Sequence, residues 1–320
     1  MPATLKPIAL EDIQAARARI AGSAIRTPLV RLNVEDAPAQ IYLKLENLQP
    51  IGSFKLRGAG NAIALAAADQ LAKGVYTASA GNMAQGVAWN ARRLGIPCTV
   101  VVPDNAPETK LAAITRLGGQ IIKVPRDEWW NVVVTHRYEG LEGLFIHPVS
   151  DPAVMAGNGT IGLEILEDLP DVDTILIPYG GGGLSCGIAS AVRALKPDTR
   201  LYACEVETSA ALAAALAAGS IQSIQYTPSF VDGIGSTSVL AEMWPLVQSL
   251  LDGSLVSSLA EVSAALRLLL ERNRVLAEGA GATPVAAALS GKAGSGKVVC
   301  VVSGGNLDLS KLVRIIEGEM

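Results

Sequence analysis

Residues 74–103 read GVYTASAGNMAQGVAWNARRLGIPCTVVVP, and this stretch decides the fold. Two short runs rich in β-branched residues, at 74–79 and 97–103, flank a segment with helical spacing at 81–95. Strands that alternate with helices of about 10 to 15 residues are typical of parallel sheets built from βαβ units. The stretch therefore predicts two parallel strands joined by a helix.

The same alternation continues on both sides of this unit. Further helices are expected at 10–21, 106–119, 159–169 and 184–196, and further strands at 40–48, 120–125, 173–179, 200–206 and 297–302. The strands and helices form two series, and two sheets fit them better than one. We predict an α/β protein with two domains, each an open, mostly parallel twisted sheet with helices on both faces.

The composition excludes several classes of protein. The chain has 320 residues, with 26 Lys and Arg against 30 Asp and Glu, and its basic residues are scattered, so we expect no nucleic-acid partner. Two histidines and four widely separated cysteines without a C-x-x-C pair argue against a zinc site. The N-terminus lacks the pattern of a signal peptide and no apolar run could span a bilayer, so we expect a cytoplasmic protein without membrane contact.

Three glycine-rich turns follow three of the expected strands: Ser79–Asn82, Gly180–Gly183 and Ser303–Asn306. In open α/β sheets, ligands bind beyond the carboxyl ends of the strands, where helix N-termini carry partial positive charge. The tetraglycine is the best phosphate cradle of the three, because its backbone N–H groups can converge just before a helix. It matches neither a Walker A loop nor a G-x-G-x-x-G fingerprint. We expect one composite site for an anionic ligand.

The stretch PIGSFKLRGAG, residues 50–60, contains a single lysine, Lys55. This lysine could clamp a phosphate, lie on the surface beside Arg57, or act as a covalent nucleophile. If Ser53 caps a helix that begins near Phe54, Lys55 lies in the first turn, where the helix dipole lowers the pKa of an ammonium. Imine formation requires the unprotonated amine. Taken alone, the stretch favours a surface lysine.

Six motifs nevertheless occur together in this chain: GSFKLRGAGNAI at 52–63, SAGNMAQGVA at 79–88, HPVSDPAVMAGNGTIGLEIL at 147–166, GGGGLSCGIA at 180–189, EGAGA at 278–282 and VVSGGNLDL at 301–309. With them, the chain resembles the pyridoxal-phosphate (PLP) enzymes of fold type II, which share the fold of the tryptophan synthase β subunit. Within that family it is similar to the serine/threonine dehydratase and serine racemase branch. The resemblance implies a large PLP-binding domain at 1–68 and 151–320, a small substrate-binding domain at 69–150, and a homodimer.

The resemblance also implies a role for each motif residue. Lys55 would form the Schiff base with PLP and act as the base at Cα of the substrate. Phe54 would pack against the pyridine ring, Asn82 would bond the ring hydroxyl, and Ser303 would meet the pyridine nitrogen. The phosphate would lie against Gly180, Gly181, Gly182 and Gly183. The amino-acid substrate would contact Ser79, Ala80, Gly81, Asn82 and Met83.

A serine at the pyridine nitrogen indicates which reaction is favoured. A neutral hydroxyl does not hold that nitrogen protonated, so charge at Cα is better discharged by expelling a β-substituent. We therefore predict an ammonia-lyase that converts a β-hydroxy L-amino acid, such as threonine, serine or a bulkier β-aryl-serine, to a 2-oxo acid and ammonia. The alternatives are a β-replacement synthase of the cysteine type, an amino-acid racemase, and a non-enzymatic small-molecule sensor.

The substrate loop departs from the family pattern of Ser-Ser-Gly-Asn-His at two positions. In the racemase branch the second serine exchanges a proton with the substrate, and Ala80 cannot do so. We therefore expect little or no racemase activity. Met83 replaces the histidine and makes that side of the pocket less polar. This change is either neutral or favours a bulkier, more apolar side chain than that of serine.

The family's divalent-cation site is matched only in part. Glu205 stands at the first ligand position, but Ala211 occupies the second, so Glu205 is a weak candidate and we expect no bound divalent cation. Glu278 begins the segment that lies near the cofactor in relatives and is given a supporting role. His147 and Pro148 belong to the crossover into the large domain and are interpreted as structural.

Overall fold

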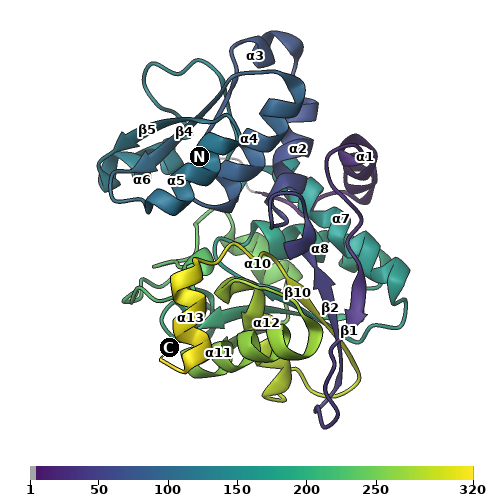
Figure 1. Cartoon of the computed structure of the whole chain (residues 1–320). Helices are drawn as coiled ribbons and strands as arrows, with labels where there is room; N and C mark the ends of the chain where they lie inside the picture. The colour runs from purple at the N-terminus through teal and green to yellow at the C-terminus, as the bar shows by residue number, and fades with distance from the viewer. Residues whose placement is uncertain (1–4, 320) are drawn as a thin grey trace.

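A computed structural model describes residues 5–319, so residues 1–4, which open the predicted large domain, and Met320 lie outside the described part. The strands are β1 (Leu29–Arg31), β2 (Gln40–Leu45), β3 (Val75–Ala78), β4 (Cys98–Pro103), β5 (Gln120–Val124), β6 (Leu144–Phe145), β7 (Thr174–Pro178), β8 (Arg200–Val206), β9 (Gly253–Ser257) and β10 (Lys297–Val302). They form a six-stranded sheet of order β1-β2-β10-β7-β8-β9 and a four-stranded sheet of order β5-β4-β3-β6 (Figure 1).

Every pair of neighbouring strands is parallel except β1 and β2. The stretch that decided the fold forms the pair β3 and β4, in which Val75 lies opposite Cys98 and Ala78 opposite Val101. The prediction of two mostly parallel sheets is confirmed.

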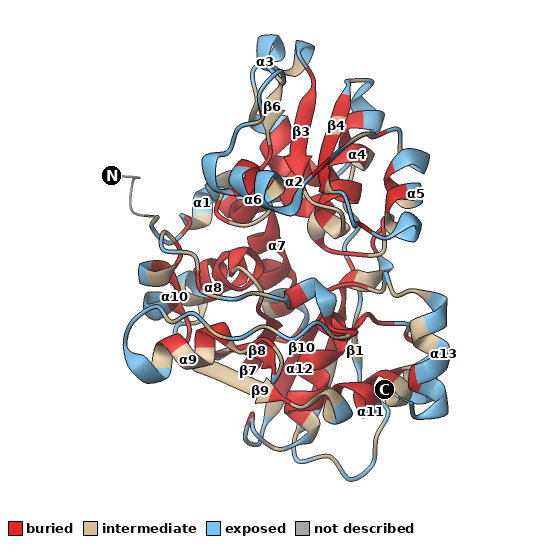
Figure 2. Ribbon diagram, turned by 90° about the vertical axis from the view of Figure 1, so that its left-hand side faces the viewer, coloured by how far each residue is buried: buried red, intermediate tan, exposed pale blue. Residues whose placement is uncertain are grey.

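Helices pack on both faces of each sheet, as predicted. They are α1 (Leu10–Ile20), α2 (Lys55–Leu65), α3 (Ala68–Ala72), α4 (Asn82–Leu94), α5 (Glu108–Arg116), α6 (Arg126–Thr135), α7 (Pro152–Asp168), α8 (Gly183–Leu195), α9 (Ala211–Ala218), α10 (Trp244–Leu250), α11 (Leu259–Leu268), α12 (Gly279–Leu289) and α13 (Leu309–Glu317). Figure 2 shows β3, β4 and β10 as largely buried, β9 as largely intermediate, and much of α5, α6 and α13 as exposed.

The central strands β7 and β10 of the six-stranded sheet are buried on both faces because they carry apolar residues at nearly every position. In β7, Ile175 and Ile177 pack with α1, α7, α8 and α10, whereas Leu176 packs with α11 and α12 on the opposite face. Successive side chains of a strand point to opposite faces, so this alternation follows directly from the run of branched residues.

The four-stranded sheet consists of strands that all lie between Val75 and Phe145. One face packs against α4 and the other against Val132 and Val133 of α6. The core on the α4 side also includes Ala59, Ala62 and Ile63 of α2, which the sequence analysis assigned to the large domain. Helix α2 therefore packs with both halves of the molecule, against α4 and against α7.

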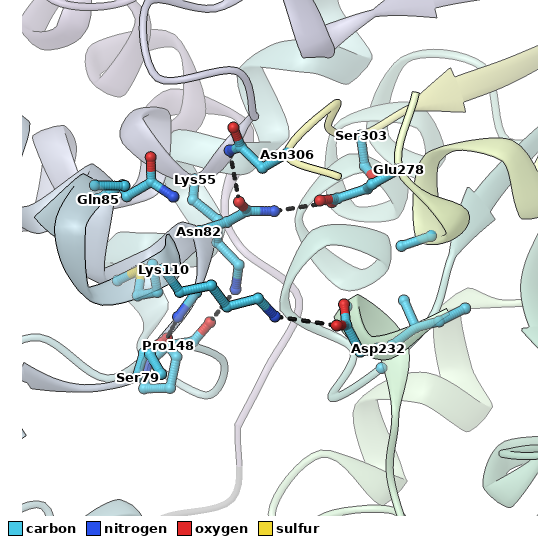
Figure 3. Close-up of a pocket in the computed structure, with 18 of the residues that line it drawn as sticks. Lys55, Ser79, Asn82, Gln85, Lys110, Pro148, Asp232, Glu278, Ser303 and Asn306 are labelled. Carbon is cyan, nitrogen blue, oxygen red and sulfur yellow. Dashed lines mark hydrogen bonds and ion pairs between the residues drawn. The ribbon is translucent and has the colours of Figure 1, made fainter. Parts of the chain in front are cut away.

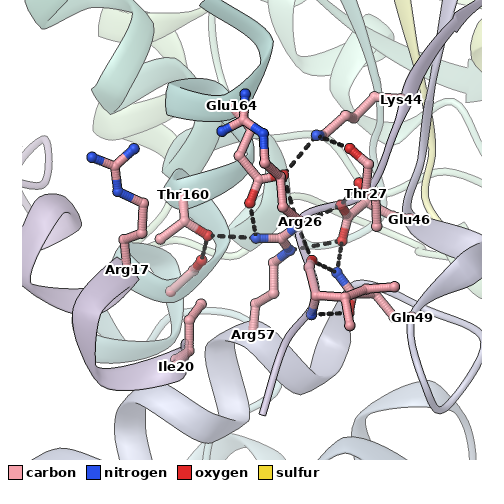
Figure 4. A network of polar contacts seen from close by, with 12 residues as sticks. Arg17, Ile20, Arg26, Thr27, Lys44, Glu46, Gln49, Arg57, Thr160 and Glu164 are labelled. Carbon is pink, nitrogen blue, oxygen red and sulfur yellow. Dashed lines mark hydrogen bonds and ion pairs between the residues drawn. The ribbon is translucent and has the colours of Figure 1, made fainter. Parts of the chain in front are cut away.

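A buried cluster of charges ties α2 to the six-stranded sheet (Figure 4). Arg57 of α2 is 2% exposed and donates hydrogen bonds to Glu46, at 2.8 Å, and to Glu164 of α7, at 2.7 Å. Lys44 of β2, which is fully buried, donates to Glu164 at 2.6 Å and to the carbonyl of Thr27 at 2.7 Å. Two cations and two carboxylates thus neutralise one another around Arg57, which lies two residues after Lys55 in the chain.

Candidate functional site

A pocket of about 510 Å³ lies between the two halves of the molecule (Figure 3). The turns that follow β3, β7 and β10 all contribute to its wall, as do the first residue of α2 and the segment around Pro148. The carboxyl ends of strands from both sheets therefore meet at this pocket, as expected for a ligand site in an α/β fold.

Lys55 is the first residue of α2, and its side chain reaches the pocket. Its Nζ donates to the carbonyl of Pro148 at 2.7 Å and lies 5.2 Å from the centre of the Phe54 ring. The surrounding protein removes bulk water from the ammonium and lowers its pKa to about 8, although the nearby charge of Glu278 opposes this shift. At pH 7 about a tenth of the amine is therefore unprotonated, far more than for an ordinary lysine.

The expected cap of this helix is not present. Ser53 was expected to cap a helix beginning near Phe54, but the helix begins at Lys55 with Phe54 in the capping position and without a side-chain cap. Ser53 instead forms a β-bridge with Gly304, and its buried hydroxyl has no hydrogen-bond partner among the described residues. The loop before α2 is thus attached to the turn after β10, and this attachment excludes Ser53 from capping the helix.

The tetraglycine forms the turn between β7 and α8, and a Cβ would fit poorly at several of its positions. A Cβ on Gly181 would lie 2.6 Å from a methyl group of Val149, and one on Gly183 would lie 2.5 Å from the Val149 carbonyl oxygen. Gly182 has a φ of +98°, which favours glycine. No side chain caps the N-terminus of α8. Its first residues, Gly183 and Leu184, line the pocket, and such an uncapped helix N-terminus can bind a phosphate.

Asn82 begins α4, and its side-chain amide is held from two sides (Figure 3). Its Nδ2 donates to Oε1 of Glu278 at 2.8 Å, and its Oδ1 accepts from Nδ2 of Asn306 at 2.8 Å. Glu278 is buried, and this burial together with the charge of Asp232 raises its pKa to about 7. The three side chains come from α4, the start of α12 and the turn after β10.

The loop between β3 and α4, residues 79–81, was assigned to the substrate, and it lines the pocket with free space beside its backbone. The backbone N–H of Gly81 donates to Oγ of Ser79 at 3.2 Å, and a Cβ on Gly81 would meet no atom within 4 Å. An anionic group could therefore approach this backbone closely. Ala80 is half-buried at the pocket, and Met83 contributes to its wall although its side chain is 1% exposed and packed in the core.

Ser303 is buried at the end of β10, and it also lines the pocket. The structure thus brings together at one pocket every residue assigned to the cofactor or the substrate: Phe54, Lys55, Ser79, Ala80, Gly81, Asn82, Met83, Gly180, Gly181, Gly182, Gly183 and Ser303.

Glu205 does not belong to this group. Its carboxylate accepts hydrogen bonds from the backbone N–H groups of Leu212 and Ala213, each at 2.8 Å, and from the hydroxyl of Ser254 at 2.5 Å. Among residues 5–319, no three His, Cys, Asp or Glu side chains gather as a metal site would require. The carboxylate that matches the family's cation ligand serves here to hold the N-terminus of α9.

Several residues that line the pocket, or that bond to its lining, were not predicted from the sequence. Lys110 of α5 donates to Asp232 at 3.1 Å, and Lys311 of α13 donates to the same carboxylate at 3.0 Å. Thr109 donates to Asp308 at 2.9 Å. Apart from Asp308, which lies in the VVSGGNLDL motif, these residues lie in segments without a recognisable motif, so no sequence signal identified them.

The role of Asn306 was also not predicted from the sequence, although that residue ends the SGGN motif.

Among the described residues, no helix is both long and apolar enough to cross a membrane.

Comparison with known proteins gives consistent results. A family model described as pyridoxal-phosphate dependent enzyme matches residues 20–304. The L-threonine ammonia-lyase of Geobacter sulfurreducens is 43% identical over 313 residues, which cover 95% of this chain and 77% of that protein. The catabolic L-threonine dehydratase TdcB of Escherichia coli K12 is 38% identical over 316 residues, covering 97% of this chain and 96% of that protein.

Two solved structures are also similar. Maize serine racemase superposes with a TM-score of 0.90 at 34% identity, and 98% of each chain is covered. The processed threonine deaminase isoform 2 of Solanum lycopersicum superposes with a TM-score of 0.89 at 33% identity, covering 96% of this chain and 86% of that one.

Proposed function

Because this chain belongs to the pyridoxal-phosphate dependent enzymes, we propose that it is an ammonia-lyase that eliminates water from a β-hydroxy L-amino acid. The predicted family, cofactor and class of enzyme are confirmed by the relatives, several of which are named threonine ammonia-lyase or dehydratase. The observation that carries the proposal is the position of Lys55, whose amine has a pKa of about 8 and shares a pocket with the uncapped N-terminus of α8.

The residues present fit the cofactor. The tetraglycine turn would hold its phosphate, since these glycines line the pocket at the uncapped N-terminus of α8. Lys55 would bind its aldehyde, Phe54 would pack against its ring, and Asn82 and Ser303 would meet the ring hydroxyl and nitrogen. When bound, PLP supplies an aldehyde that condenses with amines and a ring that withdraws electrons from Cα of the substrate.

The chain's own residues then account for binding and proton transfer. The backbone of Ser79–Gly81 binds the substrate carboxylate at the open side of the loop. Lys55, freed when the substrate amine takes its place, would use its Nζ to take the proton from Cα. The bond from Cβ to the hydroxyl oxygen would break with loss of water, and the tetraglycine turn would hold the cofactor phosphate, which can supply the proton for the leaving oxygen. The enamine that is released takes up water and gives a 2-oxo acid and ammonia.

We also propose that the chain divides into a large domain at 1–68 and 151–320 and a small domain at 69–150. The confinement of the four-stranded sheet to residues between Val75 and Phe145 supports this division. We propose further that the protein is a cytoplasmic homodimer. The four cysteines are buried free thiols, which supports a reducing compartment, and the family resemblance supports the dimer.

The proposal is tested first by absorbance and then by activity. With PLP added, the protein should show an absorbance band at about 410 nm. It should also release a 2-oxo acid from L-threonine, L-serine or L-threo-phenylserine. Lys55→Ala should abolish both signals, whereas Lys73→Ala, at an exposed lysine paired with Glu142, should abolish neither. A band that survives Lys55→Ala unchanged contradicts the assignment of Lys55.

A racemase is the second candidate, because maize serine racemase has a similar structure. Ala80 provides no hydroxyl at the pocket, so we expect the purified protein to interconvert L- and D-serine slowly or not at all. Ala80→Ser should raise the rate of interconversion relative to elimination, as measured by chiral chromatography. Rapid interconversion by the unmodified protein would show that another group supplies the second proton.

A further inference from the structure

Asn82, Glu278 and Asn306 form a continuous line of hydrogen bonds at the pocket, here called the amide relay (Figure 3). Asn306 Nδ2 donates to the carbonyl of Ile51 and to Oδ1 of Asn82, each at 2.8 Å. Asn82 Nδ2 then donates to Oε1 of Glu278 at 2.8 Å. The relay joins a backbone carbonyl to a buried carboxylate through two amides.

The two ends of the relay fix the direction in which both amides point. A backbone carbonyl can only accept a hydrogen bond, so the nitrogen of the Asn306 amide must face Ile51. The second hydrogen of that nitrogen then meets Asn82, whose oxygen must face Asn306. The nitrogen of Asn82 is left facing Oε1 of Glu278, which accepts its hydrogen bond. Rotation of the Asn82 amide by 180° would place its nitrogen against Nδ2 of Asn306 and its oxygen against Oε1 of Glu278.

Two glycines next to the relay leave space for its side chains. A Cβ on Gly304 would lie 2.5 Å from Oε1 of Glu278, and one on Gly52 would lie 2.8 Å from Oδ1 of Asn306. The backbone N–H of Asn306 also bonds to Glu278. Glycines in the IGS and SGGN segments thus make room for the two residues that orient Asn82.

We propose that Asn306 and Glu278 are positioning residues that hold the Asn82 amide with its N–H group, and not its carbonyl, facing the ring oxygen of the cofactor. This inference rests on the proposed contact between Asn82 and that oxygen. Asn82 Nδ2 carries two hydrogens, and among the described residues only Glu278 accepts one of them. The second hydrogen stabilises the ring oxygen as an anion, whereas a carbonyl in its place would stabilise the protonated hydroxyl.

The test reverses the relay without removing it. In Glu278→Gln the side-chain oxygen still accepts from Asn82, so the orientation of the Asn82 amide and the absorbance band at about 410 nm should be retained. In the double variant Asn306→Asp/Glu278→Gln, residue 306 can only accept and residue 278 can donate, so the Asn82 amide should rotate. We expect the visible band to lose at least half of its intensity to the near ultraviolet and the Kd for PLP to rise at least fivefold. Asn105→Asp, which adds the same charge at an exposed position of the same pocket, should change neither quantity more than twofold.

The double variant would overturn the proposal if its spectrum and Kd matched those of Glu278→Gln. Should it fail to fold, selective labelling of asparagine side chains with ¹⁵N gives a second test on the unmodified protein. Of all side-chain amides, that of Asn82, assigned through its loss in Asn82→Asp, should show the largest shift when PLP is added. No shift at Asn82 refutes the proposal.

These results also separate the relay from the proposed function. If Lys55→Ala abolishes the band and Asn82→Asp shifts it, but the double variant behaves like Glu278→Gln, the enzyme assignment stands and the relay is refuted. If the unmodified protein shows no band with PLP, the proposed function itself is refuted.

Discussion

Replacing Arg57 with methionine should destabilise the protein far more than its single charge suggests. Arg57 is 2% exposed and satisfies Glu46, which is fully buried, and Glu164, which is 4% exposed. Methionine fills a similar volume but leaves two buried carboxylates with only Lys44 to balance them. Removing one partner of a buried ion pair costs about 3–5 kcal/mol. At about 2 °C per kcal/mol for a chain of this size, the Tm should fall by roughly 6–10 °C.

The assay is thermal and urea unfolding of the apoprotein, with Arg26→Met as the matched control. Arg26 also bonds two carboxylates, Glu167 and Asp168, but its side chain is 47% exposed, so its loss should cost only about 0–1 kcal/mol. Adding Glu46→Gln to Arg57→Met should recover part of the loss, because it removes one of the unpaired charges. Equal losses for the two arginine variants would refute the argument from burial.

The pH dependence of the same variant gives an independent check. Burial by itself raises the pKa of Glu46, but the charge and hydrogen bonds of Arg57 hold it below its ordinary value. A carboxyl with a lowered pKa adds stability above its unfolded pKa and loses that stability as the pH falls. The difference in the free energy of unfolding between the wild type and Arg57→Met should therefore shrink as the pH falls below about 4.5.

Four further outcomes are expected. The rate at which the apoprotein captures PLP should rise with pH through about 8, because Lys55 must lose its proton. Stopped-flow absorbance measures this rate, and a flat profile between pH 6 and 9 would contradict the expectation. Gly181→Ala should weaken PLP binding by at least tenfold in an equilibrium titration, whereas Gly22→Ala, where a Cβ would lie 3.4 Å from its neighbour, should leave it unchanged. The raised pKa of Glu278 means that the apoprotein should lose stability as the pH rises from about 5 to about 7 in urea titrations, and Glu278→Gln should remove this loss. Thermal stability should be insensitive to EDTA and to added Mg²⁺, because protein donors occupy the Glu205 carboxylate; a rise in Tm with Mg²⁺ would show a cation site.

The sequence predicted the parts of the molecule that depend on local pattern. Alternating apolar runs and helical spacing gave β3, α4 and β4, and glycine-rich turns after strands identified the pocket wall. Lys55 was correctly placed in the first turn of its helix. Each of these features is encoded within about 30 residues, so a local stretch of chain contains the signal for it.

The remaining features depend on contacts between distant parts of the chain. Arg57 fitted an interpretation as a surface charge beside Lys55, because its partners Glu46 and Glu164 come from segments that no local pattern connects to it. Ser53 could not be excluded as a cap until the turn at Gly304 was seen to bind its backbone. Asn82 and Asn306 are separated by 224 positions, and only the folded chain brings their amides together.

The hydrogen bond from Lys55 to the carbonyl of Pro148 has a consequence for the speed of the reaction cycle. In the proposed reaction, the amine leaves the cofactor and later returns to it in each turnover. A flexible lysine released into solvent would sample many rotamers before it returned, and each of these would delay recapture. The Pro148 carbonyl provides a fixed resting place for the amine at 2.7 Å, inside the same pocket. Held there, the released lysine would remain at a high effective concentration close to the cofactor site.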